Sequence, residues 1–127
     1  MTSPESITST VIEKWCAGFA KLDAVALSSL YSKHAFFFGS NPKLYRGRDG
    51  VADYFNGLPR WRQPSAVFSE VRAAHAGPDL INMGATITFD LAGEREEFSV
   101  KMSWVILRED GDWKIVNHHA SSRAPLI

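Results

Sequence analysis

Apolar residues recur at intervals of three or four near the start of the chain, which places them on one face of a helix. The recurring residues are Ile7, Val11, Trp15, Phe19 and Leu22. The sequence just before them offers a serine as N-cap and a proline for the first helical position, both of which favour a helix start. The pattern predicts one long amphipathic helix within residues 3–23.

Two shorter helices and one strand are predicted next. Asp23 can cap a helix through "AVALSSLYSKH" (24–34), which would place Tyr31 on its inner side. The aromatic run "AFFFGS" (35–40) precedes a cluster of turn-forming residues and indicates a strand that leads into a loop. Asp49 can cap a third helix, which ends before the next prolines.

The period changes to two from residue 65 onward, which is typical of strands with one buried face. Four such runs are separated by the turn-forming clusters "AGPD", "AGER" and "EDGD". In the second and third runs the predicted inner residues are Ile81, Met83, Ala85, Ile87, Phe89 and Leu91, then Phe98, Val100, Met102, Trp104 and Ile106. The second half of the chain therefore predicts a meander of long antiparallel strands.

The last strand, "GDWKIVNHHASS", contains two adjacent histidines. Trp113 and Ile115 define its inner face, and steps of two then place Asn117 and His119 on that face, with His118 outward. Because neighbouring strand residues point to opposite sides, the two histidines could share a metal ion only across a bulge. The spacing predicts neither a metal site nor a cofactor.

Composition and charge narrow the classes of protein to which this chain can belong. A chain of 127 residues with 45% hydrophobic residues is typical of one globular domain, here spanning 1–127. Its 14 basic and 14 acidic residues give no broad positive field for nucleic acid or an anionic membrane. A single cysteine, no apolar run of membrane-spanning length and no signal-peptide pattern favour a cytoplasmic protein.

Two arginine-containing stretches keep open the hypothesis that the protein binds nucleic acid. The stretches "YRGR" and "PRWRQ" combine arginines with an aromatic ring, a mixture that can hold a phosphate or a single strand. The residues are Arg46, Arg48, Arg60, Arg62 and Trp61. The zero net charge favours solvated loops over a nucleic-acid surface.

The order of elements and three quoted stretches together resemble the nuclear transport factor 2-like superfamily, and within it the SnoaL-like group. The stretches are "VIEKWCAGFAKLDAVALSSLYS", "LYRGRDGVADYF" and "LREDGDWKIVNHHAS". The last of them is also similar to the end of the calcium/calmodulin-dependent kinase II association domain. The resemblance covers nearly the whole chain.

The resemblance implies an α+β fold in which a strongly curved, mostly antiparallel sheet wraps around a cavity and three helices cover its mouth. It also implies dimers that form through the sheet. The superfamily includes ketosteroid isomerase, scytalone dehydratase, polyketide cyclases and limonene epoxide hydrolase beside domains without chemistry, so fold does not settle function. The isomerase's general base would fall near Gly39, its tyrosine near Trp15 and its aspartic acid near Ser103 or Trp104, so its chemistry is not supported here.

Two hypotheses of function stay open beside the nucleic-acid alternative. In the first, the cone binds a hydrophobic small molecule, and His119 is the acid/base group of a cyclase, isomerase, dehydratase or hydrolase type of enzyme. The predicted ligand-binding residues are Asn117, Trp15, Tyr31, Tyr54, Met102 and Trp104, although core packing is the favoured interpretation for each of the last five taken alone. In the second, the chain is a non-catalytic domain that forms homodimers or binds a partner.

Overall fold

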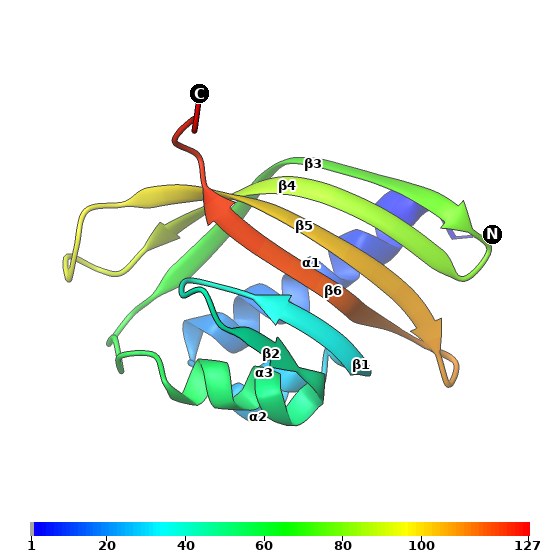
Figure 1. The fold of residues 1–127 in the computed structure, drawn as a ribbon, viewed down its shortest axis with the longest axis horizontal. Coiled ribbons are helices and arrows are strands. Elements are labelled where there is room, and N and C mark those ends of the chain that lie inside the picture. Colours follow the sequence, from blue (N-terminus) through cyan, green and yellow to red (C-terminus); the bar gives the residue numbers. More distant parts are fainter. Residues whose placement is uncertain (1) are drawn as a thin grey trace.

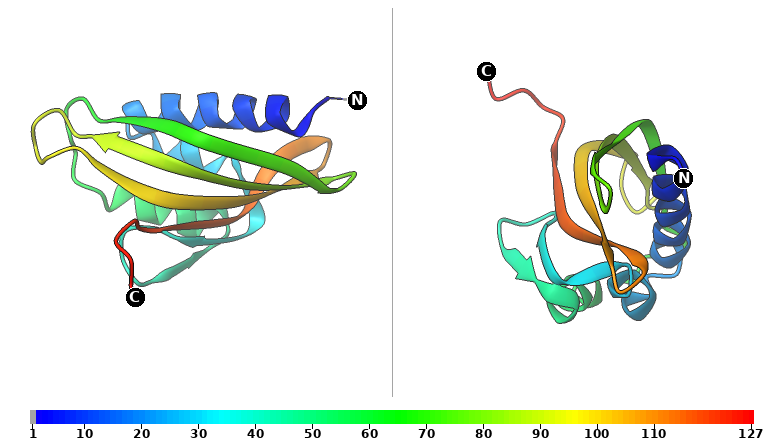
Figure 2. Two further views of the ribbon diagram at one scale, coloured as in Figure 1. Left: turned by 90° about the horizontal axis from the view of Figure 1, so that it is seen from above. Right: turned by 90° about the vertical axis from the view of Figure 1, so that its right-hand side faces the viewer.

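The computed structural model describes residues 2–127, which form three helices and one six-stranded sheet (Figure 1). The elements are α1 (Pro4–Ala20), α2 (Ala24–Ser28), β1 (Tyr31–Phe38), β2 (Leu44–Arg46), α3 (Gly47–Asn56), β3 (Ser65–Gly77), β4 (Leu80–Asp90), β5 (Phe98–Glu109) and β6 (Asp112–Ser122). The strand order is β2-β1-β6-β5-β4-β3, and only β1 and β6 pair in parallel. The sheet curves strongly, and α1 lies across its open side (Figure 2). The predicted α+β architecture is confirmed.

The first helix begins as predicted. The Ser3 hydroxyl accepts a hydrogen bond from the Ser6 backbone N–H at 3.1 Å, and Pro4 occupies the first helical position. The apolar stripe from Ile7 to Phe19 is buried against the sheet. No helix in residues 2–127 is long and apolar enough to cross a membrane.

The second and third helices differ from the prediction at their ends. Asp23 does cap α2, accepting from the Ala26 N–H at 3.0 Å, but the helix stops at Ser28 rather than His34. Tyr31 is therefore a strand residue, because β1 pairs with β6 from Tyr31 onward. The third helix is preceded by β2, which the sequence did not predict, and it begins at Gly47, ahead of Asp49. The φ of Gly47 is +68°, a conformation that glycine adopts readily, so the chain can turn there directly out of β2.

The four long strands and the inner faces of β4 and β5 are confirmed. Ile81, Met83 and Ile87 on β4 are buried, as are Trp104 and Ile106 on β5. These side chains line the concave face and form one core with α1.

The last strand contains a bulge that reverses its two faces. Ile115 pairs with Ile106, whereas Asn117 pairs with the next residue, Val105, so Val116 is an extra residue without a partner. The pairing of β6 with β1 shifts at the same place. After the bulge His118 points inward and is 3% exposed, whereas Asn117 and His119 are exposed. The expected inward direction of Asn117 and His119 is therefore wrong.

A polar cluster ties α3 to the sheet near the start of β1. The buried Ser32 hydroxyl donates to Glu109 Oε2 at 2.6 Å, and Arg48 lies 3.4 Å from Glu109 Oε1. Arg48 also donates from Nε to the Tyr31 carbonyl at 2.8 Å. The hydrogen bond from Ser32, supported by the charge of Arg48, holds the pKa of the Glu109 carboxyl below its usual value.

Glu109→Gln is expected to destabilise the fold near neutral pH and to lose this effect in acid. Because the folded pKa is lowered, the carboxylate contributes stability above the unfolded glutamate pKa of about 4.3, and this contribution disappears as pH falls through the folded pKa. Urea unfolding of both proteins should show a difference at neutral pH that narrows from about pH 5 toward pH 2. Glu96→Gln, on the exposed β4–β5 connection, is the control and should show no difference. A Glu109→Gln difference that does not change with pH would contradict the ionic origin of the effect.

Candidate functional site

A cavity of about 470 Å³ lies between α1, α3 and the concave face of the sheet. Its wall is rich in aromatic rings, which belong to Trp15, Phe19, Phe37, Tyr54, Phe55, Trp61, Phe89 and Phe98. Hydroxyl groups and one arginine add polarity, at Ser40, Ser99, Ser121, Ser122 and Arg95. Among the described residues, the wall includes no Asp or Glu. An apolar wall with few polar groups is typical of sites for small molecules.

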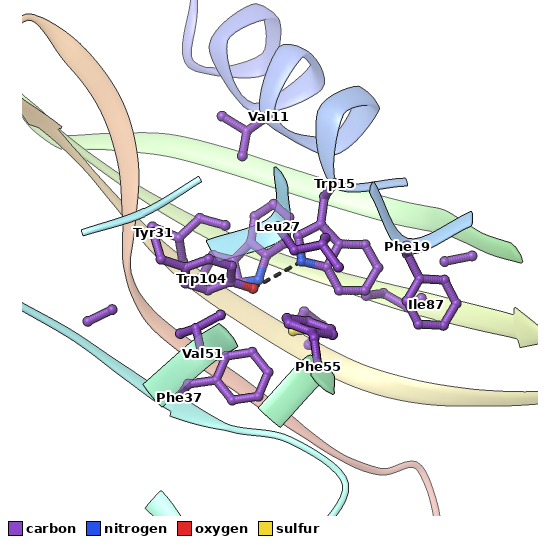
Figure 3. Packing of buried hydrophobic residues seen from close by; sticks show 14 of the residues in the cluster. Val11, Trp15, Phe19, Leu27, Tyr31, Phe37, Val51, Phe55, Ile87 and Trp104 are labelled. Carbon is purple, nitrogen blue, oxygen red and sulfur yellow. Dashed lines mark hydrogen bonds between the residues drawn. The ribbon is translucent and has the colours of Figure 1, made fainter. Parts of the chain in front are cut away.

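His118 is the imidazole in this wall, and a chain of buried hydrogen bonds holds it. Trp15 Nε1–H donates to the Tyr31 hydroxyl at 3.0 Å, which Figure 3 shows as a dashed line. The Tyr31 oxygen lies 2.8 Å from His118 Nδ1. Trp104 Nε1–H donates to the same nitrogen at 3.0 Å. Two elements of the sheet and α1 therefore fix one side of the imidazole.

Packing and burial determine the charge of this group. The imidazole stacks on Phe37, with ring centroids 3.9 Å apart and planes at 23°. Burial lowers the pKa of His118 to about 3, with a smaller contribution from the positive charge that His119 can carry. Burial also raises the pKa of the Tyr31 hydroxyl above its usual range. Near neutral pH both groups are therefore uncharged.

Tyr54 is a second polar group in the cavity wall. Its hydroxyl donates to Ser40 Oγ at 2.7 Å and accepts from the Ser40 backbone N–H at 3.0 Å. The ring lies against Gly39, where an added Cβ would stand 2.6 Å from Tyr54 Cζ. Gly39 is therefore required for Tyr54 to occupy this position.

The residues predicted as a site are divided between three places. Trp15, Tyr54 and Met102 line the cavity. Tyr31 and Trp104 are fully buried behind His118 and reach it through their polar atoms. The last two, Asn117 and His119, lie on the outer face of the sheet, where His119 contacts Phe38.

The residue that the prediction missed is His118. A regular alternation from Ile115 assigns it to the outer face, and only the bulge turns it inward. The consecutive apolar residues Ile115 and Val116 were the available signal, because two adjacent apolar residues interrupt the alternation of a half-buried strand.

Two of the four arginines considered for nucleic-acid binding are engaged within the fold. The Arg60 guanidinium donates to the Phe55 carbonyl at 2.7 Å and to the Leu58 carbonyl at 3.1 Å, at the end of α3. Arg48 belongs to the cluster with Glu109. Trp61 lines the cavity. Within residues 2–127, no group of three or more His, Cys, Asp and Glu side chains is placed to hold a metal ion.

Comparison with known proteins identifies the family. The model of the SnoaL-like domain matches residues 9–125. The chain belongs to this family. No curated protein sequence matches it.

Solved structures that share this fold include proteins named as an association domain, as an enzyme and as a protein of unknown function. A candidate calcium/calmodulin dependent protein kinase II association domain from Xanthomonas campestris has a TM-score of 0.82 at 20% identity, over 94% of this chain and 87% of that one. An NTF2-like protein of unknown function from Pseudomonas putida has a TM-score of 0.82 at 16% identity, over 96% and 88%. A hexachlorocyclohexane dehydrochlorinase from Novosphingobium barchaimii has a TM-score of 0.75 at 17% identity, over 94% and 86%. The predicted resemblance to the NTF2-like fold and the SnoaL-like group is confirmed.

Proposed function

We propose that this SnoaL-like protein binds a hydrophobic aromatic small molecule in its cavity and presents the uncharged His118 to it. The single observation that carries the proposal is a buried imidazole in the wall of a cavity that is rich in aromatic rings. A buried polar group in such a wall gives a ligand orientation, while the rings supply most of the contact area.

Size and chemistry support the proposal. The volume of about 470 Å³ lies within the range of roughly 300–1,000 Å³ that is usual for small-molecule sites. Flat aromatic walls favour planar, ring-containing ligands.

His118 takes the place that the sequence assigned to His119. Any acid/base chemistry in the cavity would involve His118 and the hydroxyl groups of the wall, because no carboxylate of the described residues lines it. The proposal is therefore binding first, with catalysis limited to what a neutral imidazole and hydroxyl groups can perform.

Titration with 2-acetylnaphthalene tests binding through quenching of tryptophan fluorescence, since Trp15 and Trp61 line the cavity. We expect saturable quenching by the native protein and at least tenfold weaker binding by Ala120→Phe, whose new ring occupies the cavity. His119→Phe is the matched control, because it adds the same ring at the adjacent position on the outer face, and it should bind as the native protein does. No saturable binding, or equal binding by Ala120→Phe, would refute the proposal.

A second proposal concerns the outer face of the sheet, which we infer to be a homodimer interface. Phe36 is 50% exposed there and stands in register between Arg46 on β2 and Asn117 on β6, and Asn117 pairs in turn with Val105 on β5. Covering this exposed ring with a second copy of the chain would remove its apolar surface from water, which favours association through this face of the sheet.

The native protein is expected to have twice the mass of one chain in light scattering at micromolar concentration. Val105→Arg, near the centre of the outer face, should give the mass of one chain, because a second copy would bury two facing cations. Val25→Arg is the control: Val25 is 79% exposed on α2, so the dimer should persist. A native protein with the mass of one chain would contradict this interface.

A further inference from the structure

We infer that His118 is held in a single tautomer, with its proton on Nε2, and that the cavity therefore selects ligands with a hydrogen-bond acceptor oxygen, such as an aromatic ketone, quinone or phenolate. This inference rests on the proposed function, because it specifies the ligand of the same cavity. It also assigns Trp104, Tyr31 and Trp15 as positioning residues that act through His118.

The indole of Trp104 determines which nitrogen carries the proton. An indole N–H can donate a hydrogen bond but cannot accept one. Trp104 Nε1 lies 3.0 Å from His118 Nδ1, so Nδ1 must offer its lone pair. A neutral imidazole that accepts at Nδ1 carries its proton on Nε2.

The contact with Tyr31 is compatible with the same tautomer. The Tyr31 oxygen accepts from the indole N–H of Trp15 at 3.0 Å, so its own proton is available for another acceptor. His118 Nδ1 lies 2.8 Å away from that oxygen. With Nδ1 as acceptor, the Tyr31 hydroxyl can donate to the same nitrogen as Trp104, whereas a proton placed on Nδ1 would face the Trp104 N–H inside a buried core.

The same geometry opposes the charged form of the imidazole. An imidazolium carries a proton on both nitrogens, so it would meet the Trp104 N–H at Nδ1 as the other tautomer does. The titratable groups near His118 do not relieve this conflict, since Tyr31 and Tyr54 are hydroxyl groups and His119 would add a positive charge. The fixed Nε2–H is therefore poorly suited to remove a proton from a ligand.

The remaining nitrogen defines the ligand. Among the described residues, Nε2 has no hydrogen-bond partner in the protein, and His118 is part of the cavity wall. A donor in an apolar wall binds an acceptor oxygen and stabilises negative charge that develops on it. A ligand that offers only a donor, or no polar atom, would leave this N–H unpaired.

Nitrogen-15 NMR of the histidine-labelled protein tests the tautomer directly. We expect His118 to show the pattern of a neutral ring protonated on Nε2 at neutral pH. Trp104→Phe removes the donor and keeps an aromatic ring at a position that does not itself line the cavity, and it should allow a mixture of tautomers. If Trp104 had only a structural role, its substitution would lower the stability of the fold but leave the tautomer of His118 unchanged. An Nδ1-protonated ring in the native protein would overturn the inference.

Two ligands of similar shape test the selectivity. We expect 2-acetylnaphthalene to bind about tenfold more tightly than 2-isopropenylnaphthalene, which replaces the carbonyl oxygen by a carbon. The preference should shrink in Trp104→Phe and in His118→Phe, and it should persist in His119→Phe. Equal, saturable binding of both compounds by the native protein would refute the acceptor selectivity while supporting the cavity proposal. Binding of neither compound would refute the cavity proposal itself, and the NMR result would still decide the tautomer.

Discussion

Trp15→Ala is expected to reduce the free energy of unfolding by about 3–5 kcal/mol, the range for removing a large buried ring. Trp15 is 2% exposed and lies at the centre of the aromatic core (Figure 3). Its ring stacks on Phe19 at 5.3 Å between centroids and meets Phe68 edge-on at 5.7 Å. The substitution also removes the hydrogen bond to Tyr31. Because a domain of this size has a total stability of roughly 5–15 kcal/mol, the variant should be close to the limit of folding.

Calorimetry or urea unfolding measures this loss, and the melting temperature should fall by about 10 °C or more. Trp61→Ala is the matched control, because both rings line the cavity but Trp61 is only partly buried on a loop and neighbours Phe19. It should cost about 1 kcal/mol or less. If the two variants lose equal stability, Trp15 is not the centre of the core.

Gly39→Ala is expected to cost about 1–3 kcal/mol, the usual penalty for forcing extra volume into a packed region. The new Cβ would lie 2.6 Å from Tyr54 Cζ and 2.7 Å from Tyr54 Cε1, so the ring must move. Movement of the ring breaks both hydrogen bonds of the Tyr54 hydroxyl with Ser40. Phe37 and Phe55 pack against the same ring and limit where it can go.

Two further variants separate this clash from a general effect of alanine. Gly84→Ala, where an added Cβ meets nothing within 4 Å, should be neutral or slightly stabilising, since alanine restricts the unfolded chain. In a Tyr54→Leu background the cost of Gly39→Ala should largely disappear, because the opposing ring atoms are gone. Equal costs of Gly39→Ala with and without the ring would show that the steric account is wrong.

Ser40 and Tyr54 also connect this prediction to the proposed binding function. A displaced Tyr54 ring would change the wall of the cavity, in which Gly39, Ser40 and Tyr54 all take part. Weaker binding of 2-acetylnaphthalene by Gly39→Ala would therefore accompany its loss of stability. The hydrogen bonds of His118 to Tyr31 and Trp104 do not involve Tyr54, so they should persist in this variant.

Local chemistry explains the elements that were predicted correctly. Ser3 and Pro4 start a helix through contacts within the first turn, and Asp23 caps α2 through its neighbour Ala26. The inner faces of β4 and β5 were predicted from a strict period of two, because each strand has one buried face and one that is more exposed to solvent. These features depend on residues close together in the sequence.

The errors occur where distant segments compete with local preference. The residues around Tyr31 favour a helix in isolation, but parallel pairing with β6 draws them into β1. Similarly, β2 exists only because Leu44–Arg46 pair with β1. Local propensity carries no information on such partners.

The sequence by itself determined the fold class and the family resemblance, and two of the rings that it predicted to bind a ligand, Trp15 and Tyr54, line the cavity. Only the tertiary structure decided which histidine enters that cavity. The choice between His118 and His119 depends on one unpaired residue, Val116, where β6 adjusts its register to β5 and to β1 together. A shift of one residue exchanges the two faces of a strand, and its position is set by two neighbouring strands rather than by the alternation along one.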